Sequence, residues 1–514
     1  MGIALGIVLA AGAVVYHQAH TRPKRALERY KAELIAQGES FAMEDFFPRP
    51  VLRAEDGTEN FRKATQQTTN WRTIFDTNPP PSAQVVAPGR AMPGWRLDHF
   101  FKTRHQEIYT NSWDEVGAFL ENDAGAMDAA RKLIERPKVN LNLNYYEGFN
   151  LLLPHLGAIR RRTTLLAGSA MHNLHRHDSQ AATSDIRAMI AVANGLADEP
   201  LIISQIVRIQ TLRLGFDPIW AVVQSPDMTE EQLAAIQRDL ERTEFTRSME
   251  SAVLMERALV LRTIAGMRAS SKEFNTVRSG LAGLRPLVNY NGSGLNSLAS
   301  LVRLKFNEPA WRYSWSYTDE LIALQAIQVL LGTTRSARSN DCFLPHMLDQ
   351  QKKLAELGLE TNPDIESFGP TGELDARRLV SQSMGRSFQT LNRIMTVEAA
   401  RRLTITGIAL RRREIKHGNL PQELSALVPE FLSQVPRDPV DGQPLRFKLT
   451  ATNTFVLYSI GKDGVDDGGN PERPDPNATS PPDWWQGRDW LWPQPASEAE
   501  YSTFIEKEIQ DAQK

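Results

Sequence analysis

The chain has 514 residues, of which 41% are hydrophobic and 23% are charged. These fractions are ordinary for a folded protein, and the length exceeds what one hydrophobic core usually supports, so two or more domains are expected. Lysine and arginine number 59 and aspartate and glutamate 61, a formal net charge of -2 that gives no electrostatic basis for binding nucleic acid. The single cysteine, Cys342, excludes an internal disulfide framework and a cysteine-based zinc cluster.

An uncharged apolar run opens the chain, from Gly2 to Tyr16. As a helix this run spans roughly 22 Å at ~1.5 Å per residue, which is short for the ~30 Å hydrocarbon core of a bilayer. It resembles the apolar part of a signal peptide or a signal anchor, which we predict over residues 1–20. The small residues from Ala11 to Ala13 offer a cleavage site.

The apolar run also determines the predicted location. Arg22, Lys24 and Arg25 follow it, and by the positive-inside rule alone they would keep the body in the cytoplasm, as a helical adaptor. If a few basic residues precede the given start, the same rule exports the body. We predict a single-pass protein of the cell inner membrane, attached to the membrane through this segment, with its body in the periplasm. Cleavage would instead give a secreted or periplasmic protein.

Helical patterns dominate the next part of the chain. Residues 21–45 continue as a charged helical stalk, whereas frequent prolines over residues 46–111 indicate an irregular segment on the body. An α-helical body follows over residues 112–372, where Ser112 and Glu115 have the spacing of a capping box. Short connections predict antiparallel neighbours. The helices of the body are expected at 156–176, 179–197, 199–224, 229–242, 245–270 and 318–331.

A different pattern occupies residues 386–470. A long helix is predicted over 388–416 and ends at His417 and Gly418, and a short helix is predicted over 421–428. Two apolar runs, 445–450 and 454–460, flank a turn signal and predict a β-hairpin. The predicted fold class is mainly α, with a multi-helix antiparallel body and a small C-terminal α+β module. Residues 471–514 form a tail with a polar helix over 496–512 and four tryptophans: Trp484, Trp485, Trp490 and Trp492.

The second strand of this hairpin leads into an acidic loop, from Ser459 to Gly469. The loop holds three aspartates, Asp463, Asp466 and Asp467, and four glycines. Glycines permit tight turns that point carbonyl oxygens inward, and carboxylate and carbonyl oxygens are the ligands that Ca²⁺ prefers. The loop is therefore a candidate cation site, and the alternative is a solvated turn without a metal.

The order of motifs over residues 396–470 resembles the globular domain of the major pseudopilins of type II secretion systems. The shared features are a turn from Gly418 to Pro421, a turn from Asp438 to Gly442, the hairpin, and a Ser-x-Gly-x-Asp-Gly loop. The resemblance implies a pseudopilin-like α+β fold. It also implies a structural Ca²⁺ held by Ser459, Asp463, Asp466 and Asp467. The long helical body and the missing prepilin cleavage signature distinguish the chain from a pilus subunit.

The whole chain is similar in layout to a group of uncharacterised, envelope-directed bacterial proteins of the Planctomycetes and Verrucomicrobia type, and this similarity implies no activity. We expect a non-enzymatic structural or interaction protein of the bacterial cell envelope, such as an accessory of secretion or surface assembly, with an envelope protein as partner. The alternative is an envelope hydrolase or glycan-binding protein with a cleft between the helical body and the Trp-rich tail. A histidine or carboxylate pair in such a cleft would favour the enzyme.

Three further patterns have both a structural and a functional interpretation. His172 and His175 share a helix face and could ligate a transition metal, although ordinary surface histidines are favoured. Glu256 and Arg257 lie in apolar surroundings, which favours a structural ion pair over a cleft wall. The tryptophans of the tail could stack on glycans, but packing over a groove of the protein's own body is favoured. The chain has no GxSxG, P-loop or dinucleotide-binding motif.

Overall fold

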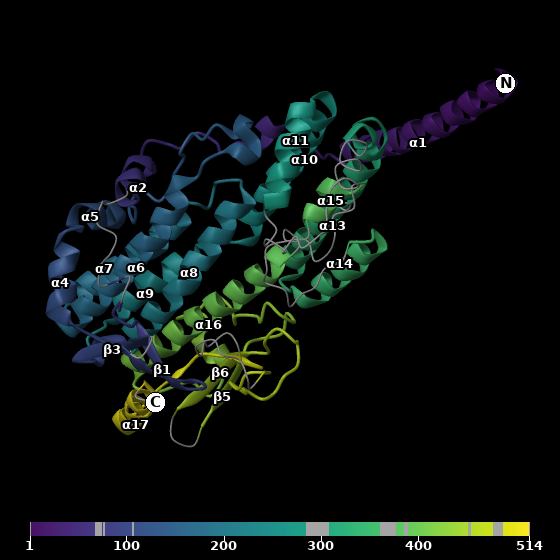
Figure 1. The fold of residues 1–514 in the computed structure, drawn as a ribbon. Helices are drawn as coiled ribbons and strands as arrows, with labels where there is room; N and C mark the ends of the chain where they lie inside the picture. The colour runs from purple at the N-terminus through teal and green to yellow at the C-terminus, as the bar shows by residue number, and fades with distance from the viewer. Residues whose placement is uncertain are drawn as a thin grey trace.

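The computed structural model describes residues 2–66, 75, 78–104, 107–283, 308–359, 377–384, 389–450, 454–475 and 487–512. Within these residues the chain is mainly helical and carries three small sheets, which confirms the predicted helical class (Figure 1).

Helix α1 (Gly2–Ala36) begins the fold and projects from it at its N-terminal end (Figure 1). Its C-terminal half packs on α13 (Ser316–Asn340), where Leu27 and Leu34 are buried with Leu324. The helix continues through Pro23 and the basic residues that follow the apolar run. The predicted stalk over residues 21–45 therefore lies against the body.

The membrane prediction is wrong. Among the described residues, no helix combines the length and the apolarity that crossing a bilayer requires. The charged residues that follow the apolar run belong to the same helix. The signal anchor, the membrane as a partner and the single-pass inner-membrane location are all corrected by this result.

The helical body forms largely where apolar periodicity predicts it. Ser112 and Glu115 form the expected capping box at the start of α4. Helix α6 packs on α7 and α8, and α10 packs on α13. The helices are α2 (Thr58–Ala64), α4 (Trp113–Glu121), α5 (Ala124–Lys132), α6 (Pro154–His175), α7 (Ser179–Asn194), α8 (Ile202–Val223), α9 (Glu230–Glu241), α10 (Thr246–Ala269), α11 (Ser271–Gly283), α14 (Leu344–Glu356) and α15 (Leu379–Ser383).

Helix α16 (Thr390–His417) lies between α8 and α9 on one side and the C-terminal hairpin on the other (Figure 1). It ends at Gly418, which adopts φ +71° as a left-handed cap. A short 3₁₀ turn (Leu424–Leu427) stands in place of the predicted short helix. The hairpin pairs β5 (Arg446–Leu449) with β6 (Phe455–Ser459), as predicted.

The segment predicted as irregular, residues 46–111, contains two hairpins. Strand β1 (Ala83–Ala87) pairs with β2 (Arg90–Pro93), and β3 (His99–Arg104) pairs with β4 (Glu107–Ser112). Pro88 lies in the turn between β1 and β2, and Pro93 is the last residue of β2, so neither proline interrupts the interior of a strand.

The C-terminal tail joins two of the sheets. Strand β7 (Trp490–Leu491) runs antiparallel to β6, and β8 (Gln494–Pro495) runs parallel to β2. Helix α17 (Glu498–Ala512) follows and contacts β1. One apolar cluster includes Trp220 of α8, Leu403 of α16, Leu457 of β6 and Trp492 of the tail, so the helical body and the C-terminal hairpin share a core.

Candidate functional sites

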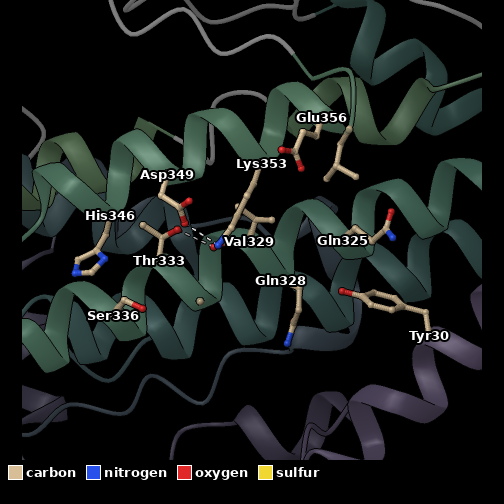
Figure 2. A pocket seen from close by; sticks show the side chains of 12 residues that line it. Tyr30, Gln325, Gln328, Val329, Thr333, Ser336, His346, Asp349, Lys353 and Glu356 are labelled. Carbon is tan, nitrogen blue, oxygen red and sulfur yellow. Dashed lines mark hydrogen bonds and ion pairs between the residues drawn. The ribbon is translucent and has the colours of Figure 1, made fainter.

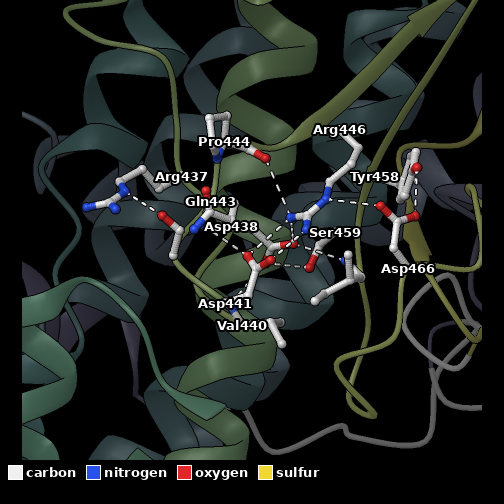
Figure 3. Close-up of polar contacts among 12 residues, drawn as sticks. Arg437, Asp438, Val440, Asp441, Gln443, Pro444, Arg446, Tyr458, Ser459 and Asp466 are labelled. Carbon is white, nitrogen blue, oxygen red and sulfur yellow. Dashed lines mark hydrogen bonds and ion pairs between the residues drawn. The ribbon is translucent and has the colours of Figure 1, made fainter. Parts of the chain in front are cut away.

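One arginine, Arg446 of β5, contacts the carboxylates on both sides of the C-terminal hairpin. Arg446 lies between three carboxylates: Nη1 is 3.0 Å from Oδ2 of Asp438, Nη2 is 2.6 Å from Oδ2 of Asp441, and Nε is 3.5 Å from Oδ2 of Asp466 (Figure 3). The turn from Asp438 to Gly442 supplies two of these carboxylates, and the acidic loop after β6 supplies the third. The guanidinium therefore links the turn to the acidic loop.

Asp438 is the buried centre of this network. Its carboxylate accepts hydrogen bonds from the backbone N–H of Val440 and of Ile460, both at 3.0 Å, and from Oγ of Ser459 at 2.8 Å. Burial raises the pKa of Asp438, although these hydrogen bonds favour the ionised form. For Asp441 burial acts in the same direction, but hydrogen bonds, chiefly from Arg446, outweigh it and lower the pKa.

The four predicted calcium ligands are divided between two environments. Ser459 is buried and its hydroxyl donates a hydrogen bond to Asp438, whereas Asp466 is exposed and accepts one from the Tyr458 hydroxyl at 2.9 Å. Asp463 and Asp467 are exposed, and neither contacts Arg446 in the described part of the chain.

The calcium prediction remains a prediction. Across the described residues, no group of three or more His, Cys, Asp or Glu side chains is arranged to hold a metal ion. Two exposed carboxylates with loop carbonyls and water can still supply the six to eight oxygens that Ca²⁺ takes. An ion in this loop would therefore depend on Asp463 and Asp467 and leave Ser459 in its bond to Asp438.

Asp489 binds the backbone at the end of the acidic loop, a contact that was not predicted from the sequence. It is fully buried and accepts hydrogen bonds from the backbone N–H of Gly469 at 2.8 Å and of Asn470 at 2.9 Å. Asp489 comes from the tail, immediately before β7. Nothing local in the sequence pairs it with the loop, because the contact forms only when β7 joins β6.

The tail packs on the body through Trp490 and Trp492, both buried, as favoured from the sequence. Trp492 rests on Gly407 of α16, where a Cβ would lie 2.5 Å from its Cε2 atom. The indole N–H of Trp220 donates to the carbonyl of Pro493 at 2.9 Å. Trp484 and Trp485 lie outside the described residues.

A cleft of about 250 Å³ does lie between the helical body and this tail, where the alternative function placed it. Gln224, Arg411, Glu414, Phe455 and Trp492 are among its lining residues. Its charged groups are already paired, because Arg411 Nη1 lies 2.5 Å from Glu414 Oε2. Trp492 is 4% exposed, so its ring is not open for stacking on a sugar.

The histidines of α6 serve packing. His175 stacks on Trp113 with ring centroids 5.1 Å apart, and its Nδ1 lies 3.0 Å from the Trp95 carbonyl oxygen. Burial lowers the pKa of His172, whose ring fills the space over Gly117. His172 and His175 therefore do not form a metal site in this arrangement.

Glu256 and Arg257, adjacent in sequence, have different surroundings. Arg257 is buried and donates to Glu39 at 2.7 Å and to Gln328 at 3.0 Å, which fastens the segment after α1 to α10 and α13. Glu256 is half-buried and makes no ion pair with another described residue; burial raises its pKa to about 7. The predicted structural ion pair thus exists for Arg257, but its partner is Glu39.

One histidine–carboxylate contact was not anticipated. His155, at the start of α6, has Nε2 3.1 Å from Oε2 of Glu199, in the connection between α7 and α8. The side chains are 10% and 7% exposed, and the Ser204 hydroxyl also donates to Glu199. This pair is the type of contact that would favour an enzyme, but it lies apart from the Trp-rich tail and joins two helix ends.

A groove of about 430 Å³ runs between α13 and α14, with Tyr30 of α1 at one end (Figure 2). Helix α13 forms the floor, because both α1 and α14 pack on it. Gly332 lies in this floor, and a Cβ built there would meet no atom within 4 Å. The missing side chain deepens the groove at its middle.

The groove is lined mainly by polar side chains (Figure 2). Lys353 and Asp349 of α14 form an ion pair of 2.6 Å. The side chains of Tyr30, Gln325 and Glu356 make no hydrogen bond or ion pair to another described residue. These groups are therefore available to a ligand.

No protein-family model, no curated protein and no solved structure matches the chain.

Proposed function

We propose that the chain is a non-enzymatic interaction protein whose binding site is the groove between α13, α14 and Tyr30. The observation that carries this proposal is an open groove of about 430 Å³ in which Tyr30, Gln325 and Glu356 make no hydrogen bond or ion pair to another described residue. This volume lies in the range of ligand sites in proteins, roughly 300–1,000 Å³. The envelope location depended on the N-terminal segment and forms no part of this proposal.

The state of the other polar clusters supports binding over catalysis. His155 and Glu199 are buried and hydrogen-bonded within the fold, and the carboxylates of Asp438, Asp441 and Asp466 are paired with Arg446. A general acid or base must reach the substrate proton within hydrogen-bond distance. In both clusters the groups face the protein's own side chains, which is typical of structural networks.

We also propose that residues 386–470 are a pseudopilin-like module that closes the C-terminal end of the body. The order of long helix, glycine cap, turn, hairpin and acidic loop supports this assignment. Arg446, Asp489 and the tail strand β7 tie the loop to the hairpin. In this role the module stabilises the body, and the groove binds the partner.

The test compares two glycine substitutions in the full chain. Gly332→Trp fills the groove, and Gly157→Trp places the same side chain on α6, at a glycine that also has open space around its Cβ position. A partner that co-purifies with the wild type and with Gly157→Trp, but not with Gly332→Trp, supports the proposal when binding is repeated with purified partner. Identical partner sets for all three proteins would contradict it.

A further inference from the structure

We propose that the groove between α13, α14 and Tyr30 binds an extended peptide segment of a partner protein that carries a lysine or arginine side chain. The inference rests on the interaction function proposed above and adds the chemistry of the ligand. Its basis is the shape of the floor, the amide side chains on it and the charge at one end.

The floor has the length of a short extended peptide. It runs along one face of α13 from Gln325 to Ser336, with Gly332 near the middle. At ~1.5 Å per residue this face is roughly 16 Å long, which matches about five residues of extended chain at ~3.3 Å each. Gly332 leaves room above the helix backbone for one side chain of such a peptide.

Two amide side chains on the floor can recognise a peptide main chain. Gln325 and Gln328 are three residues apart and therefore share a helix face. Arg257 donates to Oε1 of Gln328 at 3.0 Å, so that oxygen is held and the Nε2 group remains to donate. Gln325 offers both a donor and an acceptor. An extended main chain presents alternating carbonyl and N–H groups, which such amides complement.

The charge at the Tyr30 end favours a basic side chain. Glu356 lines this end without an ion-pair partner among the described residues. Burial and then the negative charge of nearby Glu33 raise the pKa of Tyr30, whereas the charge of Arg257, which is paired with Glu39, lowers it. Lys353 does not offset them, because Asp349 neutralises it. A lysine or arginine can pair with these carboxylates and lie over the Tyr30 ring.

The lining is less suited to a helical ligand. An amphipathic helix buries an apolar stripe, and such grooves are hydrophobic along their length. Here the aliphatic lining is limited to Val329 and Leu357, with polar side chains between and around them. An extended segment needs only main-chain partners and one or two side-chain pockets, which this groove provides.

The experiment uses a phage-displayed library of random dodecapeptides, panned against the full chain. Enriched peptides are then synthesised with a fluorescent label, and the Kd is measured by fluorescence anisotropy. We expect enriched peptides to share a lysine or arginine, and we expect Gly332→Trp to weaken binding at least tenfold. Glu356→Gln should weaken it about threefold to tenfold and reduce its salt dependence, because an ion pair is lost. Gly157→Trp should bind as the wild type does.

Melting temperatures of all variants show whether each is folded. Failure to enrich any peptide, or peptide binding that Gly332→Trp leaves unchanged, overturns the peptide inference. Binding of an oligosaccharide from a glycan array that Gly332→Trp abolishes also overturns it, but leaves the groove as a binding site and the proposed function intact. If Gly332→Trp loses its co-purifying partner although no peptide binds the wild type, the peptide inference also fails and the proposed function stands. If neither measurement responds to Gly332→Trp, both proposals fail.

Discussion

The guanidinium of Arg446 lies 3.0 Å from the carboxylate of Asp438, a side chain with no solvent exposure. Asp438 also accepts hydrogen bonds from the backbone N–H groups of Val440 and Ile460. The pair of Arg446 and Asp438 therefore joins the turn from Asp438 to Gly442 to the end of strand β6. Because the cation sits among carboxylates from two separate segments, it determines how the acidic loop is attached.

Removing the arginine should destabilise the fold. Arg446→Met leaves Asp438 buried without its counter-charge, and breaking a buried pair in this way costs about 3–5 kcal/mol. We expect a loss of this order in the free energy of unfolding, measured by urea denaturation at pH 7. The double variant Asp438→Asn/Arg446→Met should lose less than the sum of the single variants, since the unpaired charge is gone. Additive losses would show that the two residues act independently.

Much of this fold is local in origin and could be predicted. Helix α16 follows from apolar periodicity and a glycine cap, and α4 follows from the capping box of Ser112 and Glu115. The hairpin of β5 and β6 follows from two apolar runs around a turn. These signals lie within a few residues of each other, so no tertiary contact is needed to recognise them.

The features that were missed depend on contacts between distant segments. Strand β2 has its parallel partner in the tail, and Asp489 reaches the acidic loop only through β7. The groove is made by three helices, and Gly332 marks its floor by lacking a side chain, which no motif encodes. The membrane prediction was wrong because the apolar run at the N-terminus continues into a charged helix, and no described helix is long and apolar enough to cross a bilayer.

The acidic loop should make the stability of the protein depend on Ca²⁺. If the loop binds Ca²⁺, the folded state gains stability by mass action, about 2.7 kcal/mol at a concentration 100 times the Kd. We expect the melting temperature to be higher in Ca²⁺ than in chelator. The variant Asp463→Asn/Asp467→Asn should lose this difference, whereas Ser459→Ala should keep it, because that hydroxyl serves Asp438. An unchanged melting temperature for the wild type would contradict the calcium prediction.

Glu256 should make stability depend on pH. Burial raises its pKa from 4.5 to about 7, so the folded protein binds more protons than the unfolded chain between these values. Stability from this group is therefore fully present below about pH 4.5 and is lost as the pH rises through 7.

The variant Glu256→Gln isolates this contribution from the other acids. Its amide stays neutral, so we expect it to be more stable than the wild type at pH 8, by on the order of 1–3 kcal/mol, and the advantage to disappear near pH 4.5. Urea denaturation across this pH range measures the difference. A constant difference between the two proteins at every pH would show that Glu256 titrates normally.

Two helical glycines should respond in opposite ways to the same substitution. A Cβ at Gly407 would lie 2.5 Å from Cε2 of Trp492, whereas a Cβ at Gly332 meets open space. Gly407→Ala overpacks the contact between α16 and the tail, and we expect a loss of about 1–3 kcal/mol. Gly332→Ala removes backbone entropy from the unfolded chain at an unstrained helical position and should gain about 0.5–1 kcal/mol. Urea denaturation of both variants checks the signs. If Gly407→Ala is as stable as the wild type, Trp492 can move off α16 without cost, and the tail does not hold the body and the hairpin together.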